Sequence, residues 1–527
     1  MANQTRLRLL SHSLLVALSA CASQGSKDAP PPPPPPPPVM AGDFAVFTAT
    51  KDLATRTDLY LARLDQPAVA RLNGPLAAGG SVFAAAISPD RRQVAYLADE
   101  DVPGVIELYV ATVDGGGAVK VSGPMAPSSG VQAFAWAPDG SRIAYTADQG
   151  ADGRFELFTS RPDGRDNLRI SGPLVSGGFV FQFSWAPDST RLAYRAFELA
   201  ADVAELFTVR PDGADHARVS GPMAPGGNVT ALAWAPDGSR LAYRADQDVD
   251  EVFTLFTVRP DGTGLVPASP DPVPAAGGPT FLAWSPDASR LAYLAIVDNR
   301  TQLFTTRPDG SGGRLVSAVP AAGNVALFAW APDGSRLAYR ADQALDDVFE
   351  LFTVRPDGTD NVRASGPLAA GGEIISFAWA PDGSRILYLA DQATAGVPEL
   401  FSSRADGGEN VRVSASLVAG GGVGRFAWAP DGSRVAYMAE QRAAGVQELF
   451  TSLPDGGDNL AVSGPLALGG DVVTFDWTAD ASHLVYRADQ IVDNRFELFA
   501  VGPVGGASAA ISGPMVAGGE VFSFSTR

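Results

Sequence analysis

Apolar and polar positions alternate along short stretches of this chain, and turn residues separate the stretches. From residue 228 the run N-V-T-A-L-A-W alternates apolar with small or polar residues, P-D-G-S follows, and R-L-A-Y-R-A alternates again. The segment F-T-L-F-T-V-R, another P-D-G and a weaker final stretch complete the unit. A period of two, bounded by Pro, Asp and Gly, is typical of β-strands joined by turns. The unit therefore predicts four short antiparallel strands.

This unit recurs about every 49 residues over most of the chain. It carries W-[AS]-P-D-[GSA]-S-R-[LIV]-A-Y or a close relative, and a second turn, R-P-D-G or similar, bisects it. Four antiparallel strands in about 45 to 50 residues are typical of a propeller blade, which needs neighbours to bury its faces. The sequence predicts an all-β fold, a β-propeller of four-stranded antiparallel blades.

The two ends of the chain indicate how the array closes. Extending the register backwards places Gly42, Ala45 and Phe47 on the Gly, Leu and Tyr positions of the motif, without a first strand before them. The chain ends just after E-V-F-S-F-S-T-R, a first strand without the rest of a blade. One shared blade and nine whole ones predict a ten-bladed ring without exposed edges. Two smaller propellers, or a partly open ring, are the alternatives.

The Trp and the turn Asp of each repeat are expected to be structural. An Asp that starts a P-D-G turn accepts hydrogen bonds from the backbone amides that follow it, and the Trp side chains are expected to pack between blades. These positions are Trp136, Asp139, Trp185, Asp188, Trp234, Asp237, Trp284, Asp287, Trp330, Asp333, Trp379, Asp382, Trp428, Asp431, Trp477 and Asp480.

The repeat resembles a known family. W-A-P-D-G-S-R-L-A-Y-R-A-D, followed by E-L-F-T-V-R-P-D-G-T-D-N-V-R-A-S, is similar to the TolB-type propeller repeat of envelope proteins and of the non-catalytic propellers of some peptidases. The resemblance covers roughly residues 41–527 and implies the fold more than the function, because one propeller architecture hosts many roles. TolB itself has an additional N-terminal α/β domain, for which this chain has no room.

The first forty residues predict an export signal and a tether. Arg6 and Arg8 precede the short apolar run of residues 14–18, and L-S-A-C ends at Cys21, the only Cys of the chain. A run this short is typical of a secretory signal and not of a membrane span. L-S-A-C resembles the cleavage site of bacterial lipoproteins, which implies a signal peptide over 1–20, lipidated Cys21 and, with Ala22 next, the outer membrane. An ordinary signal peptide with an incidental Cys is the alternative.

Residues 21–40 are expected to hold the propeller away from the membrane. The nine prolines of residues 30–38 favour a stiff polyproline II rod of roughly 28 Å, at about 3.1 Å per residue. A docking ligand for a proline-recognising domain is the alternative. Residues 1–20 contain two Arg and no acid, so their removal takes the net charge from −19 to −21. Such an acidic protein is not expected to bind nucleic acid or anionic lipid electrostatically, so the lipid must supply the membrane contact.

The residues suited to catalysis are few. His12 leaves with the signal peptide, His216 lies in a turn, His483 replaces the Arg of S-R-L-A-Y, and there is no G-x-S-x-G motif. A zinc site or a Ser-His-Asp hydrolase would need residues that the repeat already uses. The sequence therefore predicts no catalytic residue and no cofactor, with Ca²⁺ as the one candidate ligand.

The loop between the second and third strands is the candidate site. It opens with A-D-Q in most repeats, while Phe197 and Ile296 interrupt the series. We expect an acidic rim on one face, suited to a cation or a cationic partner, at Asp148, Asp246, Asp248, Asp250, Asp342, Asp391 and Asp489. The alternate spacing of Asp246, Asp248 and Asp250 suggests Ca²⁺, but the Gly and distant Glu of an EF-hand are missing. A merely solvated rim is the alternative.

Two classes of function fit these observations. The first is a lipid-anchored, non-catalytic scaffold of the bacterial envelope that binds a protein or a glycan, facing the periplasm or the cell surface. The second is a propeller enzyme of the lyase or lactonase type, with a metal held by acids at the channel or the top face. The innermost strands, such as V-F-Q-F-S-W and V-A-L-F-A-W, are nearly interchangeable and apolar. An enzyme would need unique polar residues there, so the pattern favours the scaffold.

Overall fold

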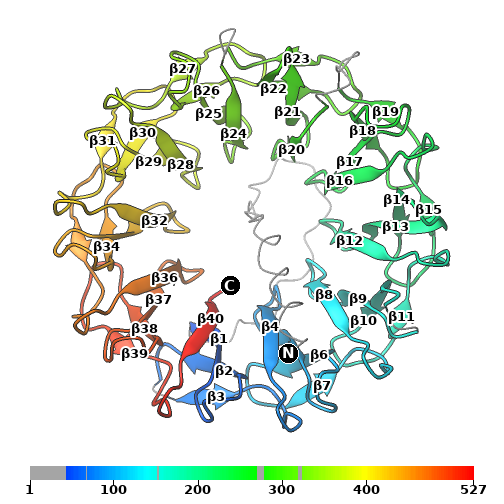
Figure 1. Ribbon diagram of the computed structural model, residues 1–527, viewed down its shortest axis with the longest axis horizontal. Coiled ribbons are helices and arrows are strands. Elements are labelled where there is room, and N and C mark those ends of the chain that lie inside the picture. Colours follow the sequence, from blue (N-terminus) through cyan, green and yellow to red (C-terminus); the bar gives the residue numbers. More distant parts are fainter. Residues whose placement is uncertain (1–42, 67, 151–152, 270–277, 319–322) are drawn as a thin grey trace, which may run out of the picture. The chain divides into compact units, whose positions relative to one another are not determined.

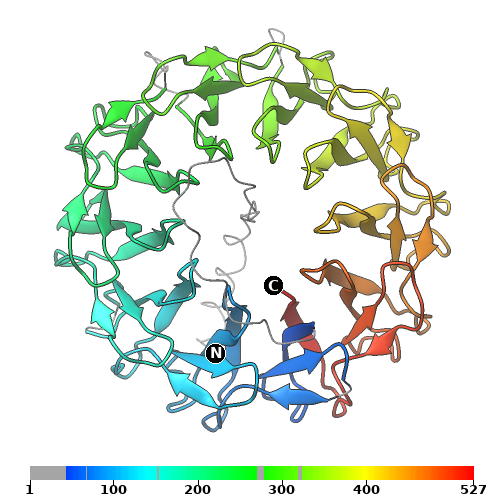
Figure 2. The same cartoon turned by 180° about the vertical axis from the view of Figure 1, so that it is seen from behind.

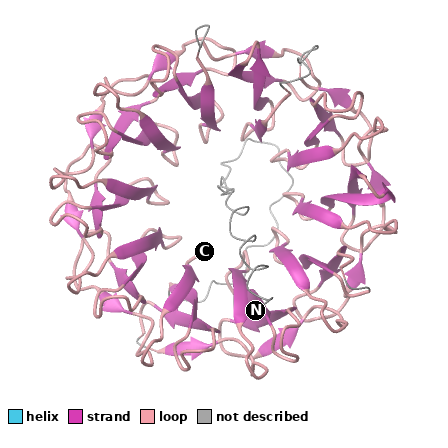
Figure 3. Ribbon diagram, in the orientation of Figure 1, coloured by secondary structure: helices cyan, strands magenta, loops and turns pink. Residues whose placement is uncertain are grey.

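The computed structural model describes residues 43–66, 68–150, 153–269, 278–318 and 323–527, all within the compact unit Pro38–Arg527. The signal peptide, Cys21 and the proline run lie outside the described residues. The described chain forms strands joined by turns and loops, without a helix among them (Figure 3). The described residues accordingly include no helix with the length and apolar character that crossing a bilayer requires.

Forty strands form ten four-stranded antiparallel sheets, the blades, which follow one another around a ring (Figure 1). The predicted ten-bladed propeller is confirmed. Blades are numbered 1 to 10 along the chain, and the innermost strands of blades 2 to 10 are β4 (Val82–Ile87), β8 (Val131–Trp136), β12 (Val180–Trp185), β16 (Val229–Trp234), β20 (Phe281–Trp284), β24 (Val325–Trp330), β28 (Ile374–Trp379), β32 (Val423–Trp428) and β36 (Val472–Trp477).

Within blades 2 to 10 the strands run in chain order from the ring's inner edge to its outer edge. Blade 5 consists of β16, β17 (Leu241–Ala245), β18 (Thr254–Val258) and β19 (Val266–Pro267). An aromatic residue of the second strand stacks on one of the third strand in all ten blades, as Tyr243 does on Phe256 with ring centroids 5.3 Å apart. The second-strand residue is Tyr in nine blades and Phe47 in blade 1. The motif Tyr thus fixes the register of the two central strands.

Blade 1 joins the two ends of the described chain. Its strands are β40 (Val521–Ser525), β1 (Phe44–Ala49), β2 (Asp58–Arg63) and β3 (Val69–Arg71), with β40 antiparallel to β1. Both views show the C-terminal strand lying beside β1 (Figures 1 and 2). The hydroxyls of Thr48 and Ser523 are 2.7 Å apart across this pair. The predicted closure by a C-terminal first strand is confirmed.

Hydrophobic clusters show that the ring is complete. Ten clusters of buried side chains occur in the described residues, and each joins two neighbouring blades. One of them joins blade 10 to blade 1 through Val485, Leu498, Ala45 and Phe47. Ten interfaces for ten blades leave no open edge, so neither a partly open ring nor two smaller propellers describes the chain.

The turn Asp and the Trp of the repeats stabilise the propeller itself. In nine P-D-G turns or their relatives, the Asp Oδ1 accepts a hydrogen bond from the backbone N–H two residues later, at 2.9 to 3.1 Å. Seven Trp side chains donate Nε1–H to a backbone carbonyl of the preceding blade. The eighth, Trp477, is fully buried between blades 9 and 10.

Candidate functional site

The loops between the second and third strands and the connections between blades share one side of the ring, called here the loop face. The P-D-G turns lie on the opposite side, the turn face. Strand alternation requires this, because the first and third connections of an antiparallel meander leave one side and the second and fourth leave the other. Hydrogen bonds between the two kinds of loop agree with it, since Asp148 of one contacts Gly130 of the other.

The Asp of A-D-Q is buried and holds the loop together. Asp148 Oδ1 accepts a hydrogen bond from Gly130 N at 2.6 Å, and its Oδ2 accepts one from Gly153 N at 2.9 Å. Only 3% of Asp148 is exposed. The carboxylate therefore joins the hairpin loop to the connection that enters the same blade, and both oxygens have backbone donors.

The same arrangement recurs around the ring. Asp99, Asp246, Asp342 and Asp489 accept from equivalent pairs of backbone amides. Asp391 Oδ2 accepts from Gly396 N at 2.9 Å. The acidic rim predicted from the sequence is therefore wrong for Asp148, Asp246, Asp342, Asp391 and Asp489, which are buried, while Asp248 and Asp250 are exposed. The sequence showed acids in a loop, but not the facing amides that remove five of them from the surface.

The negative charge of the loop face lies instead at the hairpin tips. Exposed acids at the tips include Asp52, Asp101, Asp202, Asp248, Asp250, Glu251, Asp298, Asp346, Asp347 and Asp493. Large apolar side chains are exposed in the same hairpins at Leu53, Val102, Leu199, Val249, Leu345, Ile491 and Val492. Leu345 is 65% exposed and stands directly before Asp346. The loop face thus presents apolar groups interleaved with carboxylates.

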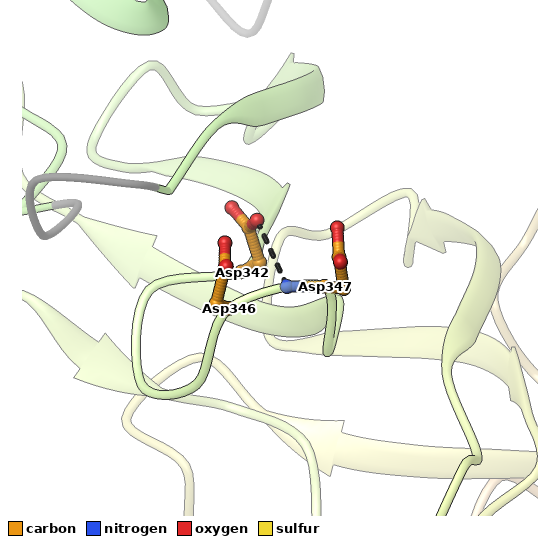
Figure 4. A group of neighbouring side chains, drawn as sticks. All are labelled: Asp342, Asp346 and Asp347. Atoms are coloured by element: carbon orange, nitrogen blue, oxygen red, sulfur yellow. Dashed lines mark hydrogen bonds between the residues drawn. The ribbon is translucent and has the colours of Figure 1, made fainter.

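One of these loops brings three carboxylates together. Asp342, Asp346 and Asp347, in the loop between β25 (Leu337–Ala341) and β26 (Glu350–Val354), each offer an oxygen within 4.8 Å of the others' (Figure 4). Asp342 is buried and accepts from the backbone N–H of Asp347 at 3.3 Å, while the other two are exposed. Carboxylate oxygens suit Ca²⁺. Within the described residues Asp246, Asp248 and Asp250, the spacing noted in the sequence, form no such group.

The polar network on the second-strand Tyr varies among the blades. In blade 3 Tyr145 donates to Gln149 at 2.9 Å and accepts from Asn167 at 2.5 Å. Burial raises the pKa of Tyr145 to about 12, although hydrogen bonds from Asn167 and Gly123 oppose the rise. The neutral hydroxyl of Tyr145 thus joins Gln149, in the loop after β9 (Ile143–Ala147), to Asn167, directly before β11 (Leu168–Arg169).

In blade 4 the two amides are replaced by an acid and an imidazole. Tyr194 donates to Glu198 Oε1 at 2.5 Å, and His216 Nε2 lies 3.1 Å from Glu198 Oε2. The sequence predicts only a turn position for His216 and only an interruption of the A-D-Q series at Phe197. The sequence does contain the signal for this exchange. In this repeat A-F-E replaces A-D-Q, and P-D-G-A-D-H replaces P-D-G-x-D-N. The carboxylate is also bonded to Gly172 N at 2.8 Å, so it serves the framework as the amide does elsewhere.

Solved structures with a similar arrangement of strands have low identity to this chain. A eukaryotic initiation factor has a TM-score of 0.48 and 12% identity, over 79% of this chain and 94% of that one. A putative TolB from Agrobacterium tumefaciens has a TM-score of 0.29 and 15% identity, over 52% of this chain and 87% of that one. An oligogalacturonate lyase in complex with manganese has a TM-score of 0.35 and 13% identity, over 67% of this chain and 94% of that one.

The family comparison is more specific than the structural one. No curated protein sequence matches the chain. The model of the lipoprotein LpqB β-propeller domain matches residues 60–193 and 318–518, together more than half of the chain. This agrees with the propeller, with the lipoprotein character expected from the L-S-A-C box, and with a place in the bacterial envelope. The chain belongs to the LpqB lipoprotein β-propeller family.

Proposed function

We propose that this protein is a lipid-anchored, non-catalytic scaffold of the outer membrane, facing the periplasm or the cell surface, whose loop face binds a protein or glycan partner. Cys21 would carry the lipid, and residues 21–40 would set the distance between membrane and ring. Acyl chains give stable anchoring where two or more are present. The family match supports the envelope placement.

The observation that carries the binding role is the composition of the loop face. Val249, Leu345 and Ile491 are each more than half exposed, and each lies within two residues of an exposed acid. Exposed apolar side chains rimmed by polar groups mark protein interaction surfaces. The carboxylates would select a partner with basic groups at the contact, since complementary charge sets specificity and association rate.

The absence of a catalytic role is part of the proposal and has its own support. Buried carboxylates at repeat positions already bond to the framework, as Asp148 does to two amides and Glu198 to Gly172. A general base needs an accessible proton acceptor beside a substrate. We therefore assign no catalytic residue and no resident cofactor to this chain.

The experiment is affinity capture from envelope extracts with the tagged full chain. The paired substitutions Leu345→Asp and Ile491→Asp alter the loop face, and Val504→Asp alters an equally exposed apolar residue on the turn face. The proposal expects a partner that is captured by the wild-type chain and by Val504→Asp, and lost with the loop-face pair. Capture that is lost only with Val504→Asp would place binding on the turn face and refute the assignment.

A second candidate function rests on the carboxylates of Asp342, Asp346 and Asp347. Ca²⁺ bound there would favour either a metal-bridged partner or the lyase or lactonase alternative. The double variant Asp346→Asn, Asp347→Asn leaves the buried Asp342 and removes two exposed ligands. A melting-temperature rise with Ca²⁺ that this variant abolishes would support the metal, because a ligand of the native state raises its stability. An unchanged melting temperature would reject it.

A further inference from the structure

In the interface between blades 1 and 2, the innermost strand of blade 2 lacks the Phe or Leu and the Trp that blades 3 to 10 carry at the same two positions. In blade 3, β8 brings Phe134 and Trp136 against blade 2. Blades 4 to 10 repeat this with Phe or Leu followed by Trp at the same positions of their innermost strands. In β4 of blade 2 the corresponding residues are Ala85 and Ile87. Two aromatic or large side chains are thus replaced by smaller ones at the seam where the ring closes.

A cavity of about 150 Å³ occupies this place. It lies between blade 1 and the innermost strand of blade 2, and Ala85, Ile87, Thr48, Ser523 and Phe524 are among its lining residues. Figure 1 shows β40 and β4 as neighbouring innermost strands. The cavity is partly open to solvent and its lining is both polar and apolar, and a volume of this size accommodates a molecule about as large as benzene.

The Trp side chains of the other interfaces indicate which kind of group would fit the seam cavity. Trp136 Nε1 donates to the carbonyl oxygen of Ala86 at 3.1 Å, and six more Trp side chains donate to the same position of the blade before them. In β40 that position is Ser525, which also lines the cavity. Thr48 and Ser523, whose hydroxyls are bonded to each other, add a polar edge.

We propose that the seam cavity binds a planar aromatic ring that carries a ring N–H, the indole class, with the carbonyl oxygen of Ser525 as acceptor. The ring takes the volume that Trp and Phe fill in other interfaces, and its faces contact Ile87 and Phe524. It arrives either as a free heterocycle or as the side chain of a tryptophan. This site is independent of the loop face and of its partner.

The test is ¹⁹F NMR of 5-fluoroindole added to the purified full chain. The cavity predicts a shifted or broadened signal that excess unlabelled indole restores. Ile87→Trp, which fills the cavity with the side chain found in other blades, is expected to abolish the effect. Ile375→Trp places the same side chain on the exposed side of another innermost strand and should leave binding intact.

A second probe distinguishes the two sources of the ring. Displacement of 5-fluoroindole by N-acetyl-tryptophanamide shows that a tryptophan side chain enters, and failure to displace restricts the site to free heterocycles. Ala85→Phe is a second filling variant should Ile87→Trp not fold, with circular dichroism as the check. An unaltered signal with the wild-type chain, or equal broadening with the wild type and a folded filling variant, would overturn the proposal.

Discussion

The indole N–H of Trp136 donates to the carbonyl oxygen of Ala86, 50 residues earlier in the chain and one blade away, at 3.1 Å. The ring packs in the cluster that joins blades 2 and 3. This separation is close to the repeat length, because Trp136 on the innermost strand of one blade contacts the innermost strand of the blade before it.

Trp136→Phe keeps an aromatic ring and removes this hydrogen bond. We expect a loss of about 1 kcal/mol in the free energy of unfolding, and of about 3–5 kcal/mol for Trp136→Ala, which also leaves a cavity. Denaturant unfolding followed by circular dichroism gives both values. Equal losses for the two variants would show that the indole N–H, and not the ring's packing, dominates the interface.

Replacing Asp148 tests whether the A-D-Q carboxylates are structural. Asp148→Ala leaves two backbone N–H groups without their acceptor, so we expect a loss of about 3 kcal/mol in the free energy of unfolding. Asp248→Ala, in the equivalent loop but exposed, is the matched control and should change stability by less than about 0.5 kcal/mol. The reverse ranking would restore the solvated rim that the sequence suggested.

The architecture could be predicted from sequence because its determinants are local and repeated. P-D-G turns, alternating strands and the Tyr and Trp of each unit recur at a fixed spacing, and the displaced first strand at residues 521–525 is visible as a missing piece. Blade number and closure follow from counting these units. A single-copy domain offers no such internal comparison.

The chemistry of the loop face could not be predicted in the same way. Asp148 and Asp248 both lie in an acidic hairpin, but only Asp148 contacts Gly130, which lies 18 residues earlier on another loop. Whether a carboxylate faces solvent or a backbone amide depends on such contacts. The replacement of Gln by Glu198 and of Asn by His216 could be found from the sequence alone, because a comparison of the repeats with one another shows it.

Acidification should weaken the turns. The backbone N–H and hydroxyl of Ser384 stabilise the ionised form and hold the pKa of Asp382 below its ordinary value of 3.8. A lowered pKa in the folded state adds stability above pH 4, which is lost as the pH falls through the lowered value. The difference in melting temperature between wild type and Asp382→Asn should be largest near neutrality and shrink below about pH 4. A difference that grows on acidification would contradict this.

Anchoring depends on one residue. Cys21→Ser removes the sulfur that would carry the lipid, and the acidic propeller has no expected electrostatic affinity for anionic membranes. We expect the wild-type chain in the membrane fraction and the variant in the soluble periplasmic fraction. Fractionation with immunoblotting measures this, and membrane retention of Cys21→Ser would show that another segment or a partner provides attachment.

The ring is closed by β40, which pairs with β1, and Thr526 Oγ1, directly after it, lies 2.8 Å from the carbonyl oxygen of Trp477. The most direct test is the thermal unfolding of a chain that ends at Gly519, alone and with a synthetic peptide of residues 520–527. We predict a lower melting temperature after truncation, because β1 loses its partner strand and becomes an exposed edge, and a rise when the peptide is added. An unchanged melting temperature of the truncated chain, with no effect of the peptide, would contradict closure by this strand.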